Sequence, residues 1–357
     1  MPTTRHRHIE SEGHVRRVPG GKVTIKDVAE MCGVSTQTIS RVINQRPDVS
    51  PETRRAVEET IARVGYHPSA LARSLVQRRS FTLGFVTTGL KYVGIAQTLT
   101  GIAEQCEALG YGLLVKDLPE SAEGELLSVI DFFDARHAEG IIVLVPGLDV
   151  PAHLAAQRLP PWCPPMVFLK SSVDDRFTTI AVDNVGGARV ATDHLLSLGR
   201  RHVAHIAGPA SCLESHERLE GWKQAIGAAG LPIDERAVAA GDWASPSGAD
   251  AFTSLLESYP EMDAVFAGND QMALGALSVC HRRGLSVPGD VAVIGFDGVS
   301  EAEHFTPSLS TMRQPLREMG LAAVTELLAR VNAGDDELPV KHVVLDVELV
   351  VRESTAG

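Results

Sequence analysis

The stretch TIKDVAEMCGVSTQTISRVIN, residues 24–44, decides how this chain is organised. Thr24 is a predicted N-cap with Asp27 three residues later, a short-armed form of the capping box. Gly33 tolerates the left-handed backbone of a tight turn, and Ser35 can cap a second helix. Apolar residues recur at helical spacing on both sides of the turn: Ile25, Val28, Ala29, Ile39, Val42 and Ile43. The stretch therefore predicts two short helices joined by a tight turn.

The second of these helices would carry polar side chains on the face opposite its apolar residues. They are Thr36, Gln37, Ser40, Arg41 and Asn44. Such side chains can donate hydrogen bonds to base edges or phosphates, which is typical of a helix-turn-helix that enters the major groove of DNA. An ordinary amphipathic helical hairpin has the same spacing, so the spacing alone leaves that alternative open.

A third helix and a short linker follow. Ser50-Pro51-Glu52 combines an N-cap, a proline and an acidic residue, and Gly65 is placed to end the helix. Three helices around one small core would form a head over residues 22–67. Residues 69–75 form a capped segment that is too short to be a stable helix alone. We therefore expect residues 68–80 to be a hinge helix and linker that orders when DNA and a partner copy are present.

Charge is unevenly distributed along the 357 residues. The first 80 residues hold 14 Lys and Arg against 8 Asp and Glu, whereas the rest holds 19 against 37. A basic head on an acidic body is expected where only the head meets phosphate. Residues 1–21 are polar and show no apolar periodicity, which predicts a disordered tail. A metal site at His6, His8 and His14 is the poorer interpretation, because nothing rigid would hold these side chains at ligand geometry.

The cysteines and the hydropathy indicate a cellular compartment. The five cysteines have no metal-ligand spacing, which predicts reduced thiols and no metal site. No apolar run reaches the length of a membrane span, and the N-terminus lacks the apolar region of a signal peptide. We therefore expect a cytoplasmic protein with no membrane partner.

From residue 81 onward, apolar strands alternate with helices. Strands are predicted at residues 82–88, 111–115, 140–144, 166–169, 203–207, 264–267, 291–295 and 343–351, and helices at 95–109, 126–136, 218–229, 272–283 and directly after residue 183. Continuous apolar strands between helices predict parallel sheets covered on both faces. The fold class is thus an all-α head on an α/β core, residues 81–357, with enough units for two doubly wound lobes.

Several short motifs follow one another along the chain: residues 23–44, Val49-Ser50, Gly65-Tyr66-x-Pro68, Ala72-x-x-Leu75, Ala207-Gly208-Pro209, Gly221-Trp222, Gly241-Asp242-Trp243, residues 269–275 and Gly295-Phe296-Asp297. Together and in this order they resemble the lactose-repressor family of bacterial transcription regulators. The resemblance implies a core like a periplasmic sugar-binding protein, in which the chain crosses between the lobes three times. The N-lobe would be about 81–182 and 313–342, and the C-lobe about 183–312 and 343–353. No apolar heptads follow, so a homodimer is expected.

The resemblance also implies which residues contact operator DNA. Thr36, Gln37 and Arg41 match base-reading positions, while Ser35, Ser40, Asn44, Lys26, Arg54 and Arg55 are candidates for phosphate contacts, and Thr24 lies beside them. Ala72 and Leu75 match the hinge, where Leu75 would wedge between base steps in the minor groove. A core leucine at the domain junction is the alternative for Leu75. A dimer predicts a palindromic operator with a deformable centre.

The same resemblance implies an effector site. Its residues would be Thr88, Lys170, Arg218, Trp243, Asn269, Gln271, Asp297 and Leu316. The chemistry suits a sugar, because Arg and Asp can engage neighbouring hydroxyls and Trp offers a flat face. Structural roles stay open as alternatives: Asp297 can cap a turn, Trp243 can anchor a loop, and Asn269 can cap the helix that follows it.

Lys170 departs from some relatives, which carry a sugar-binding Asp at that position. An ammonium group can only donate, so Lys170 would pair with an anionic sugar or phosphate, pair with a neighbouring carboxylate, or point away. We therefore expect a repressor of carbohydrate-utilisation genes that a small sugar effector releases from DNA. A corepressor-dependent regulator with a non-sugar or anionic effector is the alternative.

Two other classes of protein share parts of this pattern. A secreted solute-binding protein would have the two-lobed body, but the basic head and the lack of a signal peptide count against it. An enzyme on a doubly wound fold would need a catalytic motif, and Gly186-Gly187 lacks the rest of a dinucleotide fingerprint. We therefore expect no catalytic residues and no cofactor other than the effector.

Overall fold

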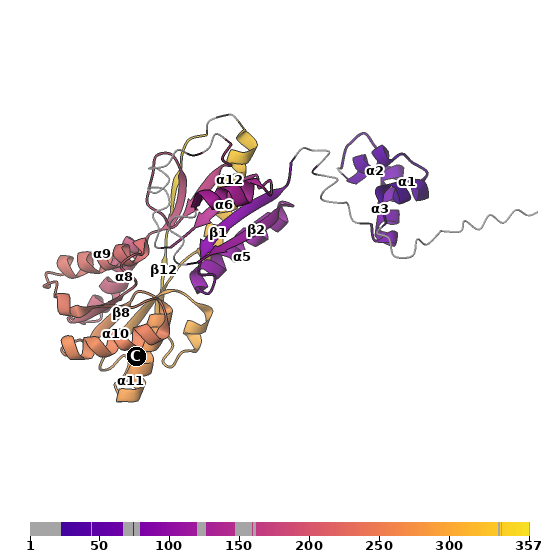
Figure 1. Ribbon diagram of the computed structural model, residues 1–357. Coiled ribbons are helices and arrows are strands. Elements are labelled where there is room, and N and C mark those ends of the chain that lie inside the picture. The colour runs from indigo at the N-terminus through magenta and orange to yellow at the C-terminus, as the bar shows by residue number, and fades with distance from the viewer. Residues whose placement is uncertain are drawn as a thin grey trace, which may run out of the picture. The chain divides into compact units, whose positions relative to one another are not determined.

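The computed structural model describes residues 23–43, 45–66, 74, 79–119, 126–146, 159, 162–334, 336 and 338–356. The chain divides into two compact units, Met1–Arg79 and Ser80–Gly357, and each unit is described by itself (Figure 1). The predicted tail, Asn44, Ala72 and Leu75 lie outside the described residues. So does the expected hinge helix, apart from Ser74, Arg79 and Ser80.

The first unit is the predicted three-helix head, made of α1 (Ile25–Cys32), α2 (Thr36–Ile43) and α3 (Pro51–Val64). The capping box forms as expected, since Asp27 N donates to Thr24 Oγ1 and Thr24 N donates to Asp27 Oδ2. Gly33 and Gly65 end α1 and α3 with left-handed backbone, both at φ +63°. The core of the head consists of Val28, Ala29, Ile39, Val42, Val57 and Tyr66. Burial of this one apolar cluster is what holds the three short helices together.

The N-lobe is built on a six-stranded parallel sheet with the order β11-β5-β4-β3-β1-β2. Its strands are β1 (Thr82–Thr88), β2 (Gly112–Leu118), β3 (Gly140–Leu144), β4 (Met166–Leu169), β5 (Thr178–Val182) and β11 (His342–Leu345). Helices α5 (Val93–Ala108) and α12 (Leu316–Ala333) cover one face, and α6 (Leu126–Asp134) covers the other. Alternation along β1 explains the two layers, because Phe85 faces α12 and its neighbour Val86 faces α6.

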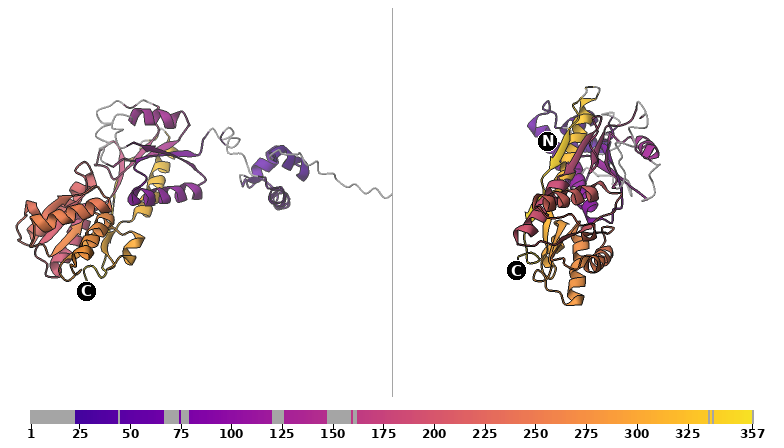
Figure 2. Two further views of the ribbon diagram at one scale, coloured as in Figure 1. Left: turned by 60° about the horizontal axis from the view of Figure 1, so that its bottom comes forward. Right: turned by 90° about the vertical axis from the view of Figure 1, so that its left-hand side faces the viewer.

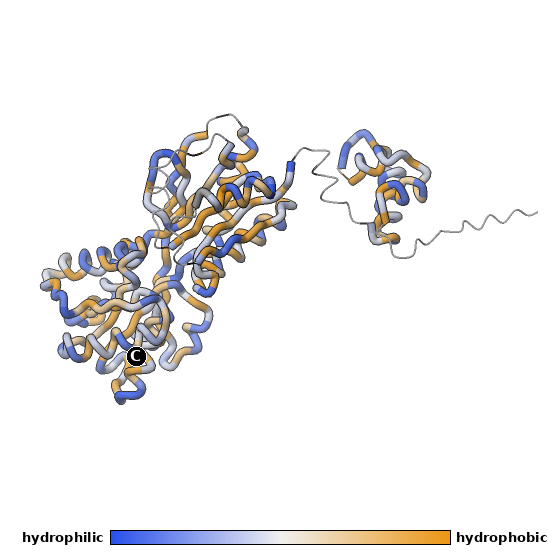
Figure 3. Tube along the Cα trace, in the orientation of Figure 1, coloured by the Kyte–Doolittle hydropathy of each residue, from blue (hydrophilic) through white to orange (hydrophobic). Residues whose placement is uncertain are grey.

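The C-lobe repeats this architecture with the sheet order β12-β10-β9-β8-β6-β7. Its strands are β6 (Val203–Ala207), β7 (Val238–Ala240), β8 (Ala264–Ala267), β9 (Ala292–Asp297), β10 (Ser310–Arg313) and β12 (Glu348–Val350). Its helices are α8 (Asn184–Ser197), α9 (Leu213–Ala228), α10 (Ser245–Ser258) and α11 (Asp270–Arg283). Figures 1 and 2 show the sheet between the pair α8 and α9 and the pair α10 and α11. The hydrophobic segments in Figure 3 follow the strands, as expected for sheets covered on both faces.

Glycine lets paired helices approach closely in both lobes. A Cβ atom on Gly101 of α5 would overlap the carbonyl oxygen of Arg317 in α12, and one on Gly221 of α9 would overlap the carbonyl oxygen of Val185 in α8. These contacts bring helix backbones together on the sheets. None of the described helices is long and apolar enough to cross a lipid bilayer.

The end of the chain differs from the prediction of one strand over residues 343–351. In the structure β11 pairs in parallel with β5 of the N-lobe, whereas β12 pairs antiparallel with β10 of the C-lobe. The third crossing therefore falls at residues 346–347, and residues 343–345 belong to the N-lobe sheet. Arg313 in turn ends β10 in the C-lobe. Asp346 and Val347 separate the two strands in sequence, and each strand completes the edge of a different sheet.

Candidate effector cavity and nucleic-acid interface

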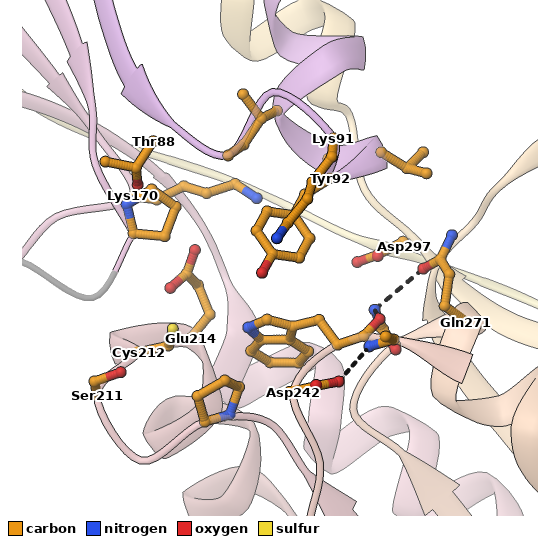
Figure 4. A pocket seen from close by; sticks show the side chains of 18 of the residues that line it. Thr88, Lys91, Tyr92, Lys170, Ser211, Cys212, Glu214, Asp242, Gln271 and Asp297 are labelled. Atoms are coloured by element: carbon orange, nitrogen blue, oxygen red, sulfur yellow. Dashed lines mark hydrogen bonds between the residues drawn. The ribbon is translucent and has the colours of Figure 1, made fainter. Parts of the chain in front are cut away.

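A cavity of about 810 Å³ lies at the carboxyl ends of the parallel strands of both lobes. This is the position where ligands bind in open parallel sheets, and small-molecule sites occupy about 300–1,000 Å³. The N-lobe contributes Thr88 at the end of β1, Tyr92 before α5 and Lys170 after β4. The C-lobe contributes loops after β6, β7, β8 and β9 and the start of α9 (Figure 4).

Seven of the eight predicted effector residues line this cavity. They are Thr88, Lys170, Arg218, Trp243, Asn269, Gln271 and Asp297. Leu316 does not line it, because as the first residue of α12 it is only 1% exposed and packs into the N-lobe core. The structure thus brings together residues that are more than 200 positions apart in sequence, and it corrects the placement of Leu316.

Arg218 of α9 is held rigidly at the base of the cavity. Its Nε donates to Asn184 Oδ1 at 2.9 Å, and its Nη1 donates to the Gly268 carbonyl oxygen at 2.5 Å. Nη1 also lies 3.7 Å from Asp297 Oδ1. Burial lowers the pKa of Arg218 from its usual value, while Asp297 acts most strongly against that shift. The guanidinium group is therefore preorganised to donate to a ligand with its remaining N–H groups.

Asp297 ends β9 in a backbone conformation that is rare for a residue with a side chain. Its φ is +120°, and its Oδ1 accepts a 2.5 Å hydrogen bond from Gln314 Nε2. Lys170 and Trp243 also have positive φ, at +52° and +73°, so three of the six such non-glycine residues in the described chain line the cavity. Strained backbone of this kind clusters at functional sites. Burial raises the pKa of the Asp297 carboxyl group, and Arg218 and Lys170 oppose the shift.

Two aromatic side chains offer flat surfaces to the cavity. The Trp243 ring lies so close to Gly208 that a Cβ atom there would overlap it. The Arg218 guanidinium carbon is 5.5 Å from the Trp243 ring centre. The Tyr92 ring from the N-lobe and the Trp243 indole from the C-lobe both line the cavity. Such faces suit the C–H surface of a sugar ring.

Asn269 has a structural role in addition to its place in the cavity wall. Its Oδ1 accepts from Met272 N at 2.8 Å and caps α11, while its Nδ2 donates to the Trp243 carbonyl oxygen and to Gln271 Oε1. The helix-capping role that the sequence left open for Asn269 is therefore present in the structure. Both amide hydrogens are in use, so what Asn269 retains for a ligand is acceptor capacity on Oδ1.

Lys170 faces carboxylates across the cavity. Glu214 lies in the first turn of α9 with only 8% of its surface exposed, and Figure 4 shows its carboxylate and the Lys170 ammonium directed into the same space. Burial lowers the pKa of Lys170, whereas Glu214 and Asp297 act to raise it. Of the possibilities left open by the sequence, the structure supports proximity to neighbouring carboxylates. The charged groups of the lining are balanced: Lys91, Lys170 and Arg218 against Glu214, Asp242 and Asp297.

Sequence reasoning missed several residues of this site. Glu214 had a usable signal, because it precedes Arg218 by four positions and so lies on the same face of α9. Tyr92, Asn184 and Gln314 had none, since only the packing of distant elements brings them to the cavity or to Arg218 and Asp297.

The head presents a separate polar surface along α2. Thr36, Gln37 and Arg41 are exposed, as the helical spacing predicted, and Arg41 Nη1 lies 3.5 Å from Asp48. Ser35 caps α2 by accepting from Thr38 N at 3.1 Å. Ser40 is half-buried on the same helix.

Two proposed phosphate contacts differ in their surroundings. Arg54 donates to the carbonyl oxygens of Arg46 and Val42, at 2.5 and 3.4 Å, so it ties α3 to the end of α2. Lys26 is exposed. Arg54 is therefore a structural residue of the head, which its charge alone did not reveal.

A three-helix head with a polar recognition face, carried on a two-lobed α/β core with a cavity between the lobes, defines a ligand-responsive DNA-binding transcriptional regulator. Residues 24–69 match the family described as bacterial regulatory proteins, lacI family, and residues 192–355 match the periplasmic binding protein-like domain. The chain belongs to the lacI family of bacterial regulatory proteins.

Individual relatives agree with this assignment over nearly the whole chain. The chain is 35% identical over 342 residues to the HTH-type transcriptional regulator CelR of Thermobifida fusca, which covers 93% of this chain and 98% of the relative. A solved CelR–cellobiose complex is 32% identical with a TM-score of 0.69, covering 93% of this chain and all of that one. A lac repressor dimer bound to operator and the anti-inducer ONPF is 31% identical with a TM-score of 0.79, covering 94% and 100%.

Proposed function

We propose that this protein is a cytoplasmic repressor of carbohydrate-utilisation genes and that a neutral sugar of one or two rings releases it from a palindromic operator. The observation that carries the proposal is the charge-balanced cavity with two aromatic faces. Its three cations and three carboxylates cancel, so a neutral polyol matches the site better than an ion of either sign.

The geometry supports a specific role for each polar group of the cavity. Arg218 would donate to adjacent hydroxyls, and Asp297 would accept from them. Trp243 would pack against the C–H face of the ring, while Lys170 and Glu214 would donate and accept from opposite lobes. CelR is similar along its whole length and has been solved with cellobiose, which makes that disaccharide the first ligand to test.

The head would read DNA as a dimer. Thr36, Gln37 and Arg41 are proposed to contact base edges, and Lys26 and Ser35 to contact phosphates. A sugar that binds with different affinity to the two conformations of the lobes would shift the dimer between DNA-binding and released states. The size of that shift is set by the difference in affinity.

The test uses the purified full-length protein and DNA from upstream of its own gene. Binding is measured by fluorescence anisotropy without ligand and with cellobiose, ribose, galactose or glucose 6-phosphate. The proposal expects a specific complex that a neutral sugar dissociates. A complex that forms only when a ligand is added would replace it with a corepressor mechanism, and a response to the sugar phosphate alone would make the effector anionic.

A further inference from the structure

A buried carboxylate lies directly behind the cavity wall and does not line the cavity. Asp270 is the first residue of α11, follows Asn269, and has no exposed surface. A buried carboxylate without a ligand to bind needs another explanation for its place in the fold.

Asp270 holds the backbone that follows Asp297. Its Oδ2 accepts from Gly298 N at 2.9 Å and from Val299 N at 2.8 Å, while its Oδ1 accepts from Thr311 Oγ1 at 2.6 Å. These three donors come from two elements, the loop after β9 and strand β10. The carboxylate therefore fixes the direction in which the chain leaves Asp297.

The surrounding backbone is shaped to admit this carboxylate. A Cβ atom on Gly295 of β9 would overlap Asp270 Oδ1, so a glycine is required at that position. Gly298 has φ +74°, a conformation that glycine adopts without strain. Asp297, between these two glycines, has φ +120°. An unusual backbone conformation of this kind persists only where neighbouring contacts enforce it.

Two charged groups act on Asp270 from neighbouring elements. Asp297 faces it from β9, and Arg218 faces it from α9 and is also the cation nearest Asp297. The contacts from β10 and from residues 298–299 are uncharged donors. Asp297 also faces Lys170 and Glu214 across the cavity. The two buried carboxylates thus share the Arg218 guanidinium group, and Lys170 is a second cation for Asp297.

We propose that Asp270 is a positioning residue for Asp297 and that the charge on this pair of carboxylates is coupled to effector binding. The proposal rests on the proposed function only in that Asp297 is taken as an effector contact. Asp270 would act through the loop at Gly298 and through its charge, without touching the ligand.

The direction of the coupling follows from the protonation of the pair. Burial, and then the charge of Asp297, raise the pKa of Asp270 to about 7, and burial raises the pKa of Asp297 as well. A proton is therefore taken up by the pair as the pH falls through neutrality. The two carboxylates share this proton, and sugar hydroxyls donate to the ionised form of Asp297. Sugar binding therefore opposes proton uptake by the pair, so effector affinity falls as the pH decreases and recovers as the pH rises.

The first test needs no effector. In the full-length protein, the amide NMR signals of Gly298 and Val299 are followed from pH 5 to 9, in the natural sequence and in Asp270→Asn. The amides of the natural protein should titrate with a midpoint near 7. In Asp270→Asn this transition should move to lower pH, because the asparagine amide cannot ionise and Asp297 then titrates without a neighbouring negative charge. Asp290→Asn, an exposed carboxylate in the same lobe, should leave the transition unchanged.

The second test measures cellobiose affinity by calorimetry over the same pH range. The natural protein should lose up to about tenfold in affinity per pH unit below the transition, the limit for uptake of one proton. In Asp270→Asn the loss should move to lower pH, because removal of a neighbouring negative charge lowers the pKa of Asp297.

A second variant keeps the inference testable if Asp270→Asn does not fold. Thr311→Val removes a donor that favours the charged form of Asp270, so the midpoint of the amide transition should move to higher pH. Amides that do not titrate in the natural protein, or pH profiles that are the same in all variants, would overturn the inference. If the amides behave as expected and no sugar binds, the positioning role is supported and the proposed sugar effector is wrong.

Discussion

The head and the core prepare their polar side chains for binding in opposite ways. In the head, Gln37 and Arg41 lie exposed on α2, above a core of six buried residues. In the core, Arg218 is 3% exposed and is fixed by Asn184, Gly268 and Asp297 before any ligand arrives. The head thus presents exposed donors to solvent, whereas the core buries charged groups that the fold already holds in place.

This difference has an energetic basis. DNA brings its own charge and hydration to an open surface, so the contact residues of the head need few partners in the free protein. A sugar offers only hydroxyl groups, which compete with water unless donors and acceptors are preorganised in a secluded site. Substitutions at contact residues should therefore leave the head folded, whereas those in the cavity should affect binding and stability together.

The substitution Arg218→Ala should have the largest effect and tests the role of buried, preorganised charge in the core. It removes the cation that lies 3.7 Å from the buried Asp297 carboxylate and leaves Lys170 as the remaining cation near it. The substitution should lower the free energy of unfolding by about 3–5 kcal/mol, with a loss of sugar affinity of at least about 100-fold. Thermal unfolding and calorimetry measure the two effects. Arg236→Ala is the matched control, because that arginine pairs with Asp234 and Glu261 on the surface of the same lobe. Unchanged sugar affinity in folded Arg218→Ala would place the effector elsewhere.

The substitution Arg41→Ala tests the exposed polar surface of the head. Loss of a base-reading arginine should weaken operator binding by about 1–3 kcal/mol, or roughly 5- to 150-fold, without lowering the unfolding temperature. Anisotropy with specific and scrambled DNA measures the effect. Arg63→Ala, an exposed arginine near the end of α3, should change operator binding much less. A destabilised head in Arg41→Ala would show that its exposed residues also serve the fold.

The substitution Lys170→Met tests the contribution of a single cation in the cavity. The change removes one cation that faces Glu214 and Asp297, so a neutral sugar should bind about tenfold more weakly, the value of one charge-assisted hydrogen bond. Lys223→Met, in α9 but away from the cavity lining, is the control. Calorimetry with cellobiose and glucose 6-phosphate distinguishes the charge preference. A selective loss of the anionic ligand would contradict the neutral effector.

Ser50→Ala should have the smallest effect. Ser50 Oγ accepts from Thr53 N at 3.2 Å and caps α3, so its loss should destabilise the head by about 1 kcal/mol. Hydrogen exchange of α3 amides reports the change, while amides of the core should exchange as before. Faster exchange in the core would show that the two units do not unfold independently.

Local signals made the head predictable from sequence. Thr24, Ser35 and Ser50 cap the helices that follow them, and Gly33 and Gly65 end α1 and α3, because each of these contacts spans only a few residues. The apolar strands β1, β3 and β8 were also predicted, since burial on both faces leaves continuous apolar runs, whereas β5, β7 and β10 were not predicted. The family resemblance supplied seven residues that the structure places on the cavity.

What the sequence could not supply depends on distant packing. Nothing local distinguishes β11 from β12, because the break between them is set by two different sheet edges. Leu316 is turned into the core by the start of α12, and Arg54 is drawn to carbonyl groups of Val42 and Arg46. In each of these cases the contact partner lies in a different segment of the chain, so residue spacing and periodicity in the sequence do not reveal the contact.

The three passages between the lobes limit how the core can move. Asp183 alone joins β5 to α8, two residues join β10 to α12, and two join β11 to β12. Two extended residues span at most about 7 Å, and Asp183 N donates to the Leu345 carbonyl oxygen, which ties the first passage to the third. Passages this short limit how far the lobes can slide apart and favour a hinge rotation between them. Gln314, in the second passage, donates to Asp297 Oδ1, so this segment directly contacts a residue of the cavity lining.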